Sequence, residues 1–187
     1  MPPREKITRD AILNAAFSLV RREGIERLSA KRLAQELSCS TQPVLYHFRT
    51  MEEIRAEVYR MADEFHTAYI LPGDTDEDPF FSLGLNYVRF GHEEPRLFRF
   101  LFQSDHFRGQ PMGALISAEG LGPVLSVAAE AVGGEAAARE LFSVFFVAVH
   151  GYASLLANNA MEYDEKECAR LLTGLFEGLT AAEKEES

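Results

Sequence analysis

Apolar residues recur along the first third of the chain at the three- and four-residue spacing of amphipathic helices. A first helix is predicted from Thr8, and Gly24 follows its last apolar position, where a C-cap is expected. A second, shorter helix has Ser29 as its N-cap. After a break at 38–40, Ser40 is the N-cap of a third helix, and Pro43 lies in its first turn, where a missing backbone N–H costs little.

The third predicted helix has one apolar face and one polar face. Val44 and Phe48 are four residues apart and share an inward side, which leaves Thr41, Gln42 and Tyr46 pointing elsewhere. Two short helices across a tight turn are the helix-turn-helix arrangement. The pattern therefore predicts that this third helix is a recognition helix.

A long fourth helix is predicted to follow. The segment TMEE at 50–53 has the spacing of a capping box. The inner stripe predicted for this helix consists of Ile54, Val58, Met61 and Phe65.

The rest of the chain is predicted to be helical as well. A loop at 70–79 ends with Asp78 and Pro79, an N-cap and first helical residue, and this helix must end near Pro95. A short aromatic helix follows, and loops are expected near 109–113 and 162–164. Further helices are predicted at 112–132 with an interruption at 120–123, at 135–160 and at 164–182. No strand alternation is found, so the predicted fold class is all-α, with domains at 6–66 and 67–187.

Charge divides the chain in the same way. The net charge of the 187 residues is −10, but residues 1–50 contain nine Lys and Arg against five Asp and Glu, a net +4. The remaining residues contain ten basic and twenty-four acidic side chains, a net −14. This asymmetry indicates a basic binding module on an acidic body.

Several classes of protein are disfavoured by what the sequence lacks. Cys39 and Cys168 are too few and too far apart for a disulfide framework, and they fit a reducing cytoplasm. No signal-peptide cleavage pattern follows the apolar stretch at 11–20, and no apolar run is expected to cross a membrane. The five histidines show no metal spacing, and we find no nucleophile paired with a base and no phosphate loop. No catalytic residue, metal or cofactor is predicted.

Residues 8–54 resemble the TetR family of bacterial transcriptional regulators. The likeness lies in TRDAILNAAFSLVRREGIERLSAKRLAQELSCSTQPVLYHFRTMEEI, which has an alanine-rich first helix, a glycine-terminated turn, Leu-Ser before a short helix and a Ser…His-Phe recognition helix. Two positions differ from the usual pattern: Leu45 replaces a tyrosine and Met51 replaces a lysine, both in roles that contact the DNA backbone.

The resemblance implies a DNA site on the third helix. Gln42 is the strongest candidate for reading a base edge, and Thr41 and Pro43 offer further contacts. Tyr46 and the start of the second helix at Ser29 are placed against phosphates. His47 is either a phosphate donor or a packing residue. The full set of predicted DNA-binding residues is Ser29, Lys31, Arg32, Ser40, Thr41, Gln42, Pro43, Tyr46, His47 and Arg49.

The resemblance also implies a ligand pocket in the C-terminal helices and a dimer formed by the last two helices. An apolar cavity with few polar groups suits a small hydrophobic effector. The predicted pocket residues are Phe98, Leu101, Phe102, Phe107, Met112, Leu115, Phe145, Phe146, Val149 and Tyr152, each of which could equally be core. Possible polar anchors are Asn86, His106 and His150. Apolar surface for the dimer is offered by Leu141, Val144, Ala148, Leu155, Leu156, Leu171, Leu172, Leu175, Phe176 and Leu179.

The expected function is therefore that of a ligand-responsive regulator in the cytoplasm. The resemblance implies a repressor that binds a palindromic double-stranded DNA operator as a homodimer. The alternative is a helical small-molecule-binding protein or enzyme whose N-terminal helices are only structural. The basic N-terminal third with a polar face on a short capped helix favours the regulator.

Overall fold

The computed structural model describes residues 7–73, 78–104, 122–132 and 135–186, and all regular structure in these residues is helical. The helices are α1 (Arg9–Glu23), α2 (Ala30–Glu36), α3 (Thr41–His47), α4 (Met51–Ile70), α5 (Pro79–Glu93), α6 (Pro95–Phe102), α8 (Gly122–Val132), α9 (Glu135–Ala157) and α10 (Glu165–Glu186), with a 3-10 turn at Ile25–Arg27. The expected all-α fold class is confirmed.

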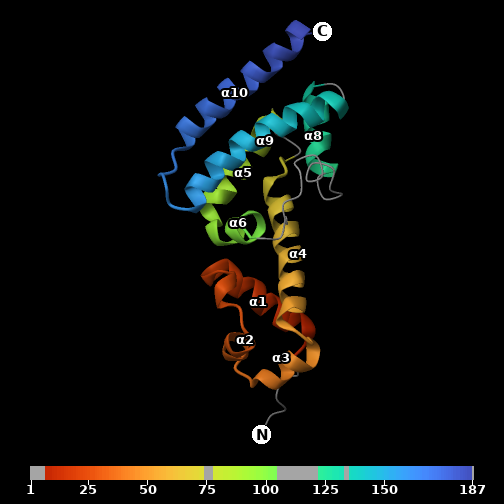
Figure 1. Cartoon of the computed structure of the whole chain (residues 1–187), viewed down its shortest axis with the longest axis vertical. Coiled ribbons are helices and arrows are strands. Elements are labelled where there is room, and N and C mark those ends of the chain that lie inside the picture. The colour runs from red at the N-terminus through yellow and green to blue at the C-terminus, as the bar shows by residue number, and fades with distance from the viewer. Residues whose placement is uncertain (1–6, 74–77, 105–121, 133–134, 187) are drawn as a thin grey trace.

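Helix α4 joins the two ends of the elongated molecule. Figure 1 shows α1, α2 and α3 at the N-terminal end and the remaining helices at the other end, with α4 running between them. It packs on α1 at one end and on α5 and α6 at the other. It crosses position 66, where the two predicted domains meet, without a break.

Local capping explains where the N-terminal helices begin. Thr8 Oγ1 accepts from the backbone N–H of Ala11 (3.1 Å), and Ser29 Oγ accepts from that of Arg32 (3.3 Å). Thr50 caps α4 in the same way. In each case the side chain satisfies one of the backbone donors left free in a first helical turn. The three predicted helix starts at 8, 29 and 50 are thus confirmed.

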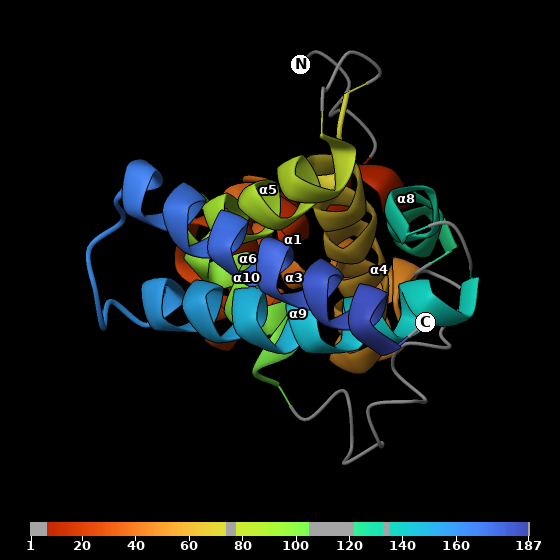
Figure 2. The same ribbon diagram turned by 90° about the horizontal axis from the view of Figure 1, so that it is seen from above.

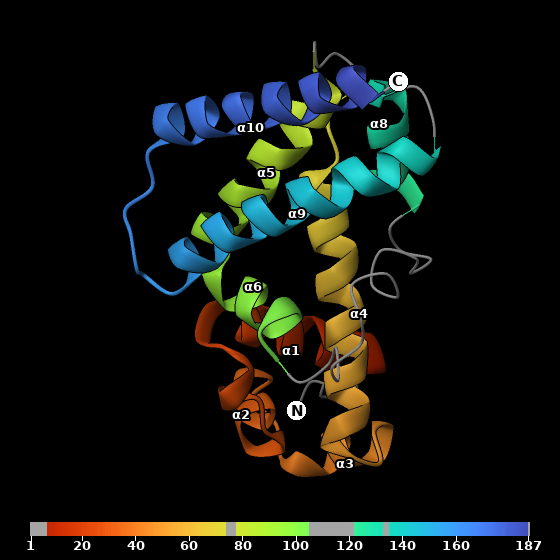
Figure 3. The same cartoon turned by 45° about the horizontal axis from the view of Figure 1, so that its top comes forward.

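The C-terminal helices form a layered body around α5 and α9. These two helices pack closely: a Cβ at Gly91 would lie 2.8 Å from the carbonyl oxygen of Ala153. Helix α10 contacts both of them, and Figures 2 and 3 show it next to α9 at the end of the molecule away from α3. Only small residues allow helix backbones to approach this closely.

Several predicted boundaries move by a few residues. Helix α9 ends at Ala157 rather than at 160, and Asn159, two residues beyond its end, has a positive φ of 54°. Helix α10 begins one residue later than predicted because Asp164 is its cap, accepting from the backbone N–H groups of Lys166 and Glu167. It continues to Glu186. The predicted helix at 112–132 is described only from Gly122.

The inner stripe of α4 also differs from the prediction. Its buried residues repeat every four positions and are Ile54, Val58, Ala62, His66 and Ile70. Met61 and Phe65 are only partly buried at the edge of this stripe. A straight helix has 3.6 residues per turn, so buried residues spaced four apart wind gradually around its axis. The buried side of α4 can therefore face α1 near its start and α5 near its end.

Candidate DNA-binding and ligand-binding sites

Helix α3 presents a polar surface above an apolar anchor. Val44 is fully buried and Phe48, which ends the helix, is 1% exposed. On the other side Thr41 and Gln42 are exposed, and the Tyr46 side chain is 82% exposed. The helix thus holds its polar side chains outward on a rigid base.

The anchor of α3 involves α1, α4 and the segment before α1. The guanidinium of Arg9 lies 4.7 Å from the centroid of the Phe48 ring and forms an ion pair of 2.7 Å with Glu57 of α4. The Nε2–H of His47 donates to the backbone carbonyl of Ile7 at 2.9 Å. This bond occupies one ring nitrogen of His47, so a contact between His47 and a phosphate would have to use Nδ1.

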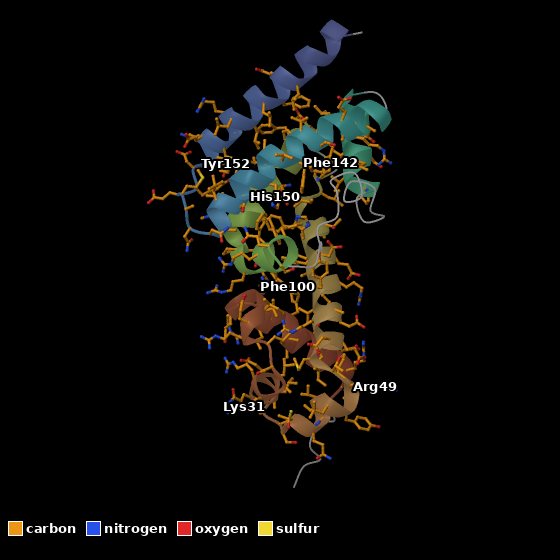
Figure 4. All side chains as sticks on the ribbon, in the orientation of Figure 1. Lys31, Arg49, Phe100, Phe142, His150 and Tyr152 are labelled. Atoms are coloured by element: carbon orange, nitrogen blue, oxygen red, sulfur yellow. The ribbon has the colours of Figure 1, made fainter. Side chains whose placement is uncertain are left out.

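The basic residues among the predicted DNA contacts differ in whether their charge is paired within the protein. Lys31 and Arg49 are exposed, and Figure 4 shows both at the end of the molecule that carries α2 and α3. Arg32 instead forms ion pairs with Glu23 (2.7 Å) and Glu36 (3.2 Å). The hydrogen bond from Arg32 is the main cause that lowers the pKa of Glu23.

At the start of α3, Ser40 is the N-cap by its backbone conformation, but its hydroxyl makes no capping hydrogen bond. Ser40 is exposed and Pro43 is half-buried. The Ser40 hydroxyl and the first backbone N–H groups of α3 therefore face the same outer surface as Thr41 and Gln42.

The two positions that differ from the family pattern lie beside this surface. Leu45 is 57% exposed on α3, and Met51, the first residue of α4, packs partly against the core. A leucine has no group that can hydrogen-bond a phosphate. The neighbouring Tyr46 hydroxyl is the nearest side chain on this helix that can do so.

The residues predicted for the ligand pocket lie in the aromatic core of the body. Phe98, Leu101, Phe145 and Val149 are buried, whereas Phe102, Phe146 and Tyr152 are half-buried. Phe107, Met112, Leu115 and the possible anchor His106 lie outside the described residues. The described members come from α6 and α9, which contact each other and both contact α5.

One predicted polar anchor is found inside this aromatic core. His150 of α9, labelled with Tyr152 in Figure 4, shares a hydrogen bond of 2.9 Å between its Nδ1 and the Tyr87 hydroxyl. Burial lowers the pKa of His150, so its ring is neutral at physiological pH. Asn86, another predicted anchor, instead donates to the backbone carbonyl of Ile70.

A second buried histidine, His66 of α4, was not among the predicted site residues. Its side chain is 6% exposed, and its ring centroid lies 4.8 Å from that of Phe90, 5.0 Å from that of Phe102 and 5.4 Å from that of Tyr87. Its Nε2 has no hydrogen-bond partner among the described residues. Burial, with a smaller effect of His150, lowers the pKa of His66 to about 3. The sequence does indicate this burial, because His66 lies four residues after Ala62 and four before Ile70, in line with the buried residues of α4.

An ion pair that connects the two ends of the molecule was also missed. Arg21, near the end of α1, donates from Nε to both carboxylate oxygens of Glu94 at 2.9 Å and from Nη2 to one of them. Glu94 joins α5 to α6, and the Arg21 guanidinium lies 4.9 Å from the centroid of the Phe65 ring on α4. Four helices thus meet at one pair of charges.

The structure separates the residues that were predicted for the dimer. Leu141, Leu156 and Leu172 are buried in the core of their own chain, at 2%, 4% and 5% exposure. Among the described side chains of α9 and α10, the exposed large apolar residues are Val144, Val147, Leu155 and Leu171. Val147 was not predicted to belong to this face.

Helix α9 is long and apolar enough at Ala138–Ala157 to span a membrane, contrary to the expectation that no segment would be. This apolar content is compatible with a helix of a protein core. One side of α9 is buried against α5 and α8, and the other carries the exposed Val144, Val147 and Leu155. The exposed apolar side chains are therefore the part of α9 that its own chain leaves uncovered.

Comparisons with known proteins agree with this fold. The family described as tetracyclin repressor-like, C-terminal domain, matches residues 80–177. No curated protein sequence matches the chain. Among solved structures, a TetR-family member from Streptomyces coelicolor A3 is 23% identical, with a TM-score of 0.54 over 89% of this chain and 96% of that one.

Two structures of the multidrug binding protein EbrR are also similar in fold. The complex with ethidium is 23% identical, with a TM-score of 0.57 over 92% of this chain and 98% of that one. The complex with imidazole is 24% identical, with a TM-score of 0.58 over 94% and 96%. With the family match over half of its length and the helix-turn-helix geometry at its N-terminal end, the chain belongs to the TetR family of transcriptional regulators.

Proposed function

We propose that this protein is a dimeric transcriptional repressor that binds a palindromic operator through α3 and is released by a small apolar effector. The observation that carries the proposal is the exposed polar face of α3 held above the buried Val44 and Phe48. A helix that is fixed on one side and polar on the other is what the major groove of DNA accepts.

The side chains of α3 suggest a division of roles at the operator. Gln42 has an amide that can donate to and accept from one adenine, and Thr41 can contact the next base. Tyr46, Lys31 and Arg49 lie around them with exposed polar ends suited to phosphates. Base contacts supply the discrimination between sequences, and phosphate contacts supply affinity for any DNA.

Dimerisation through α9 and α10 is supported by their exposed apolar residues. Val144, Val147 and Leu155 on α9 are each about half exposed, at 48%, 56% and 50%, and Leu171 on α10 is 43% exposed. Clusters of this kind on a soluble protein mark interaction surfaces. A two-fold dimer would hold two α3 helices for half-sites about 34–36 Å apart, one turn of DNA.

Release by an effector is supported by the aromatic core that α4 shares with α5, α6 and α9. EbrR, which has a similar fold, is known in complexes with ethidium and imidazole. A ligand that binds better to one position of α4 shifts the population of the protein toward that position. We place the protein in the cytoplasm, where DNA and such ligands meet.

The test is binding of the purified protein to the DNA upstream of its own gene, followed by fluorescence anisotropy across a salt series against a scrambled duplex. Preferential binding of the upstream DNA supports the proposal. Gln42→Ala should reduce discrimination at one base pair by about 1–3 kcal/mol, whereas Arg49→Ala should weaken specific and random DNA alike and flatten the salt slope.

The variant Glu64→Ala is a matched control, because this exposed residue lies on α4 away from α3. Its binding should equal that of the wild type. Absence of any specific site in a genome-wide selection would refute the repressor and leave a helical small-molecule-binding protein.

A further inference from the structure

The body of the protein contains a histidine that its own packing leaves incompletely bonded. His66 is 6% exposed, yet its Nε2 has no hydrogen-bond partner among the described residues. Buried polar atoms in folded proteins almost always have a partner, and an orphan weakens the fold. A molecule from outside the chain that reached Nε2 would supply the missing partner.

The surroundings of His66 define the shape of that partner. Three rings from two helices surround it: Tyr87 and Phe90 of α5 and Phe102 of α6, at interplanar angles of 86°, 70° and 73° to the imidazole. Edge-to-face contacts of this kind are the favourable arrangement for aromatic rings. Phe102 is itself partly exposed, whereas His66 is buried. An aromatic molecule would find the same edge-to-face contacts with these rings.

The charge of the group defines the partner further. Among the described residues the buried polar or charged side chains are His66 and Glu94, and Glu94 is bonded to Arg21. The described residues therefore offer no free buried carboxylate to pair with a cation. Burial keeps both His66 and His150 neutral by lowering the pKa of each, so neither is a counter-charge for an anion. An uncharged molecule fits best.

We infer that His66 is the polar anchor for an uncharged aromatic ligand that carries a hydroxyl group. A hydroxyl both donates and accepts, so it satisfies Nε2 whichever nitrogen of the imidazole holds the proton. The Tyr87 ring packs edge-to-face on the same imidazole, and its hydroxyl is bonded to His150 at 2.9 Å. This inference rests on the proposed function by naming the class of effector that the repressor takes.

The position of His66 also suggests how such a ligand would affect DNA binding. His66 belongs to α4, the helix that begins three residues after Phe48 at the end of α3. A hydroxyl bound at Nε2 therefore bears directly on the helix that supports the DNA-reading surface. The same ligand also touches α5 and α6 through the rings of Tyr87, Phe90 and Phe102.

The experiment is isothermal titration calorimetry of the full chain, without DNA, with 2-naphthol, 2-methylnaphthalene and the N-methylquinolinium cation. We expect 2-naphthol to bind at least about tenfold more tightly than either of the others, the size of effect that one buried hydrogen bond produces. His66→Phe should reduce that preference to less than about threefold. His92→Phe is the control: His92 is an exposed histidine stacked on Tyr163, and its replacement should leave the preference unchanged.

Equal affinity for 2-naphthol and 2-methylnaphthalene, tighter binding of the cation, or an unchanged preference in His66→Phe would overturn the inference. If His66→Phe does not fold, the wild-type protein labelled with ¹⁵N-histidine decides: the Nε2 resonance of His66 must shift on addition of 2-naphthol, and a constant resonance overturns the inference. Operator binding is measured separately. Specific DNA binding without 2-naphthol binding removes the ligand class alone, whereas His66-dependent 2-naphthol binding without any DNA binding removes the repressor alone.

Discussion

Loss of Arg21 and loss of Glu94 should lower the free energy of unfolding by very different amounts, although the two residues form one ion pair. The Arg21 side chain is 47% exposed, whereas that of Glu94 is 11% exposed. Removing the carboxylate with Glu94→Gln leaves a guanidinium that water can solvate, and we expect a loss of about 1 kcal/mol. Removing the cation with Arg21→Met leaves a buried, unpaired carboxylate, and we expect a loss of about 3 kcal/mol.

A further loss accompanies Arg21→Met because the guanidinium also lies over the Phe65 ring, a contact worth roughly 0.5–1 kcal/mol at a partly exposed site. Methionine keeps most of the apolar stem, so the change reports mainly on charge. The predicted difference between the two variants is therefore about 2–3 kcal/mol, with Arg21→Met the less stable.

The assay is urea denaturation followed by circular dichroism at one protein concentration, since a dimer makes apparent stability depend on concentration. With an m-value of roughly 2 kcal/mol/M, the midpoints of the two variants should differ by about 1 M urea. Arg22→Met, on the exposed side of the same helix, is the control. Equal midpoints for Arg21→Met and Glu94→Gln would refute the argument from burial.

Three further outcomes are expected. The pKa of His66 is about 3 in the folded protein and 6.5 in the unfolded chain, so the unfolded state binds more protons below pH 6.5. The free energy of unfolding should therefore fall by about 2 kcal/mol between pH 7 and pH 5, and by less in His66→Phe. Urea titration at each pH measures this change. Gly91→Ala should destabilise by about 1–3 kcal/mol because its methyl group would meet the backbone of Ala153, whereas Gly122→Ala, with open space around it at the start of α8, should melt like the wild type. Val147→Glu should convert the proposed dimer to monomers in sedimentation velocity while helicity is retained, and an unchanged dimer would place the interface elsewhere.

The features that the sequence predicted well are those set by neighbours along the chain. The caps at Thr8, Ser29 and Thr50 depend on a side chain and a backbone N–H three residues away, so a reader of the sequence can find them. The same holds for the outward face of α3, because the four-residue spacing of Val44 and Phe48 orients all the other side chains.

What could not be predicted depends on partners far apart in the sequence. Arg21 and Glu94 are 73 residues apart, and nothing local distinguishes them from other surface charges. His66 occupies a position that an apolar residue would fill equally well, so only the rings around it reveal its burial. On α9 both sides are apolar, and periodicity alone cannot tell Leu141, which is buried, from Val144, which is exposed.

The ion pairs formed by residues of α1 and α2 affect how few copies of the proposed repressor a cell would need. Arg22 and Arg32 share Glu23 and Glu36, so this group of four side chains carries no net charge. Paired arginines release few counterions from DNA, and such release dominates binding to random sequence. A genome offers about 10⁶–10⁹ competing sites, each of which removes protein from the search. Weak attraction to those sites leaves more molecules unbound, so that a small number per cell suffices to keep one operator occupied.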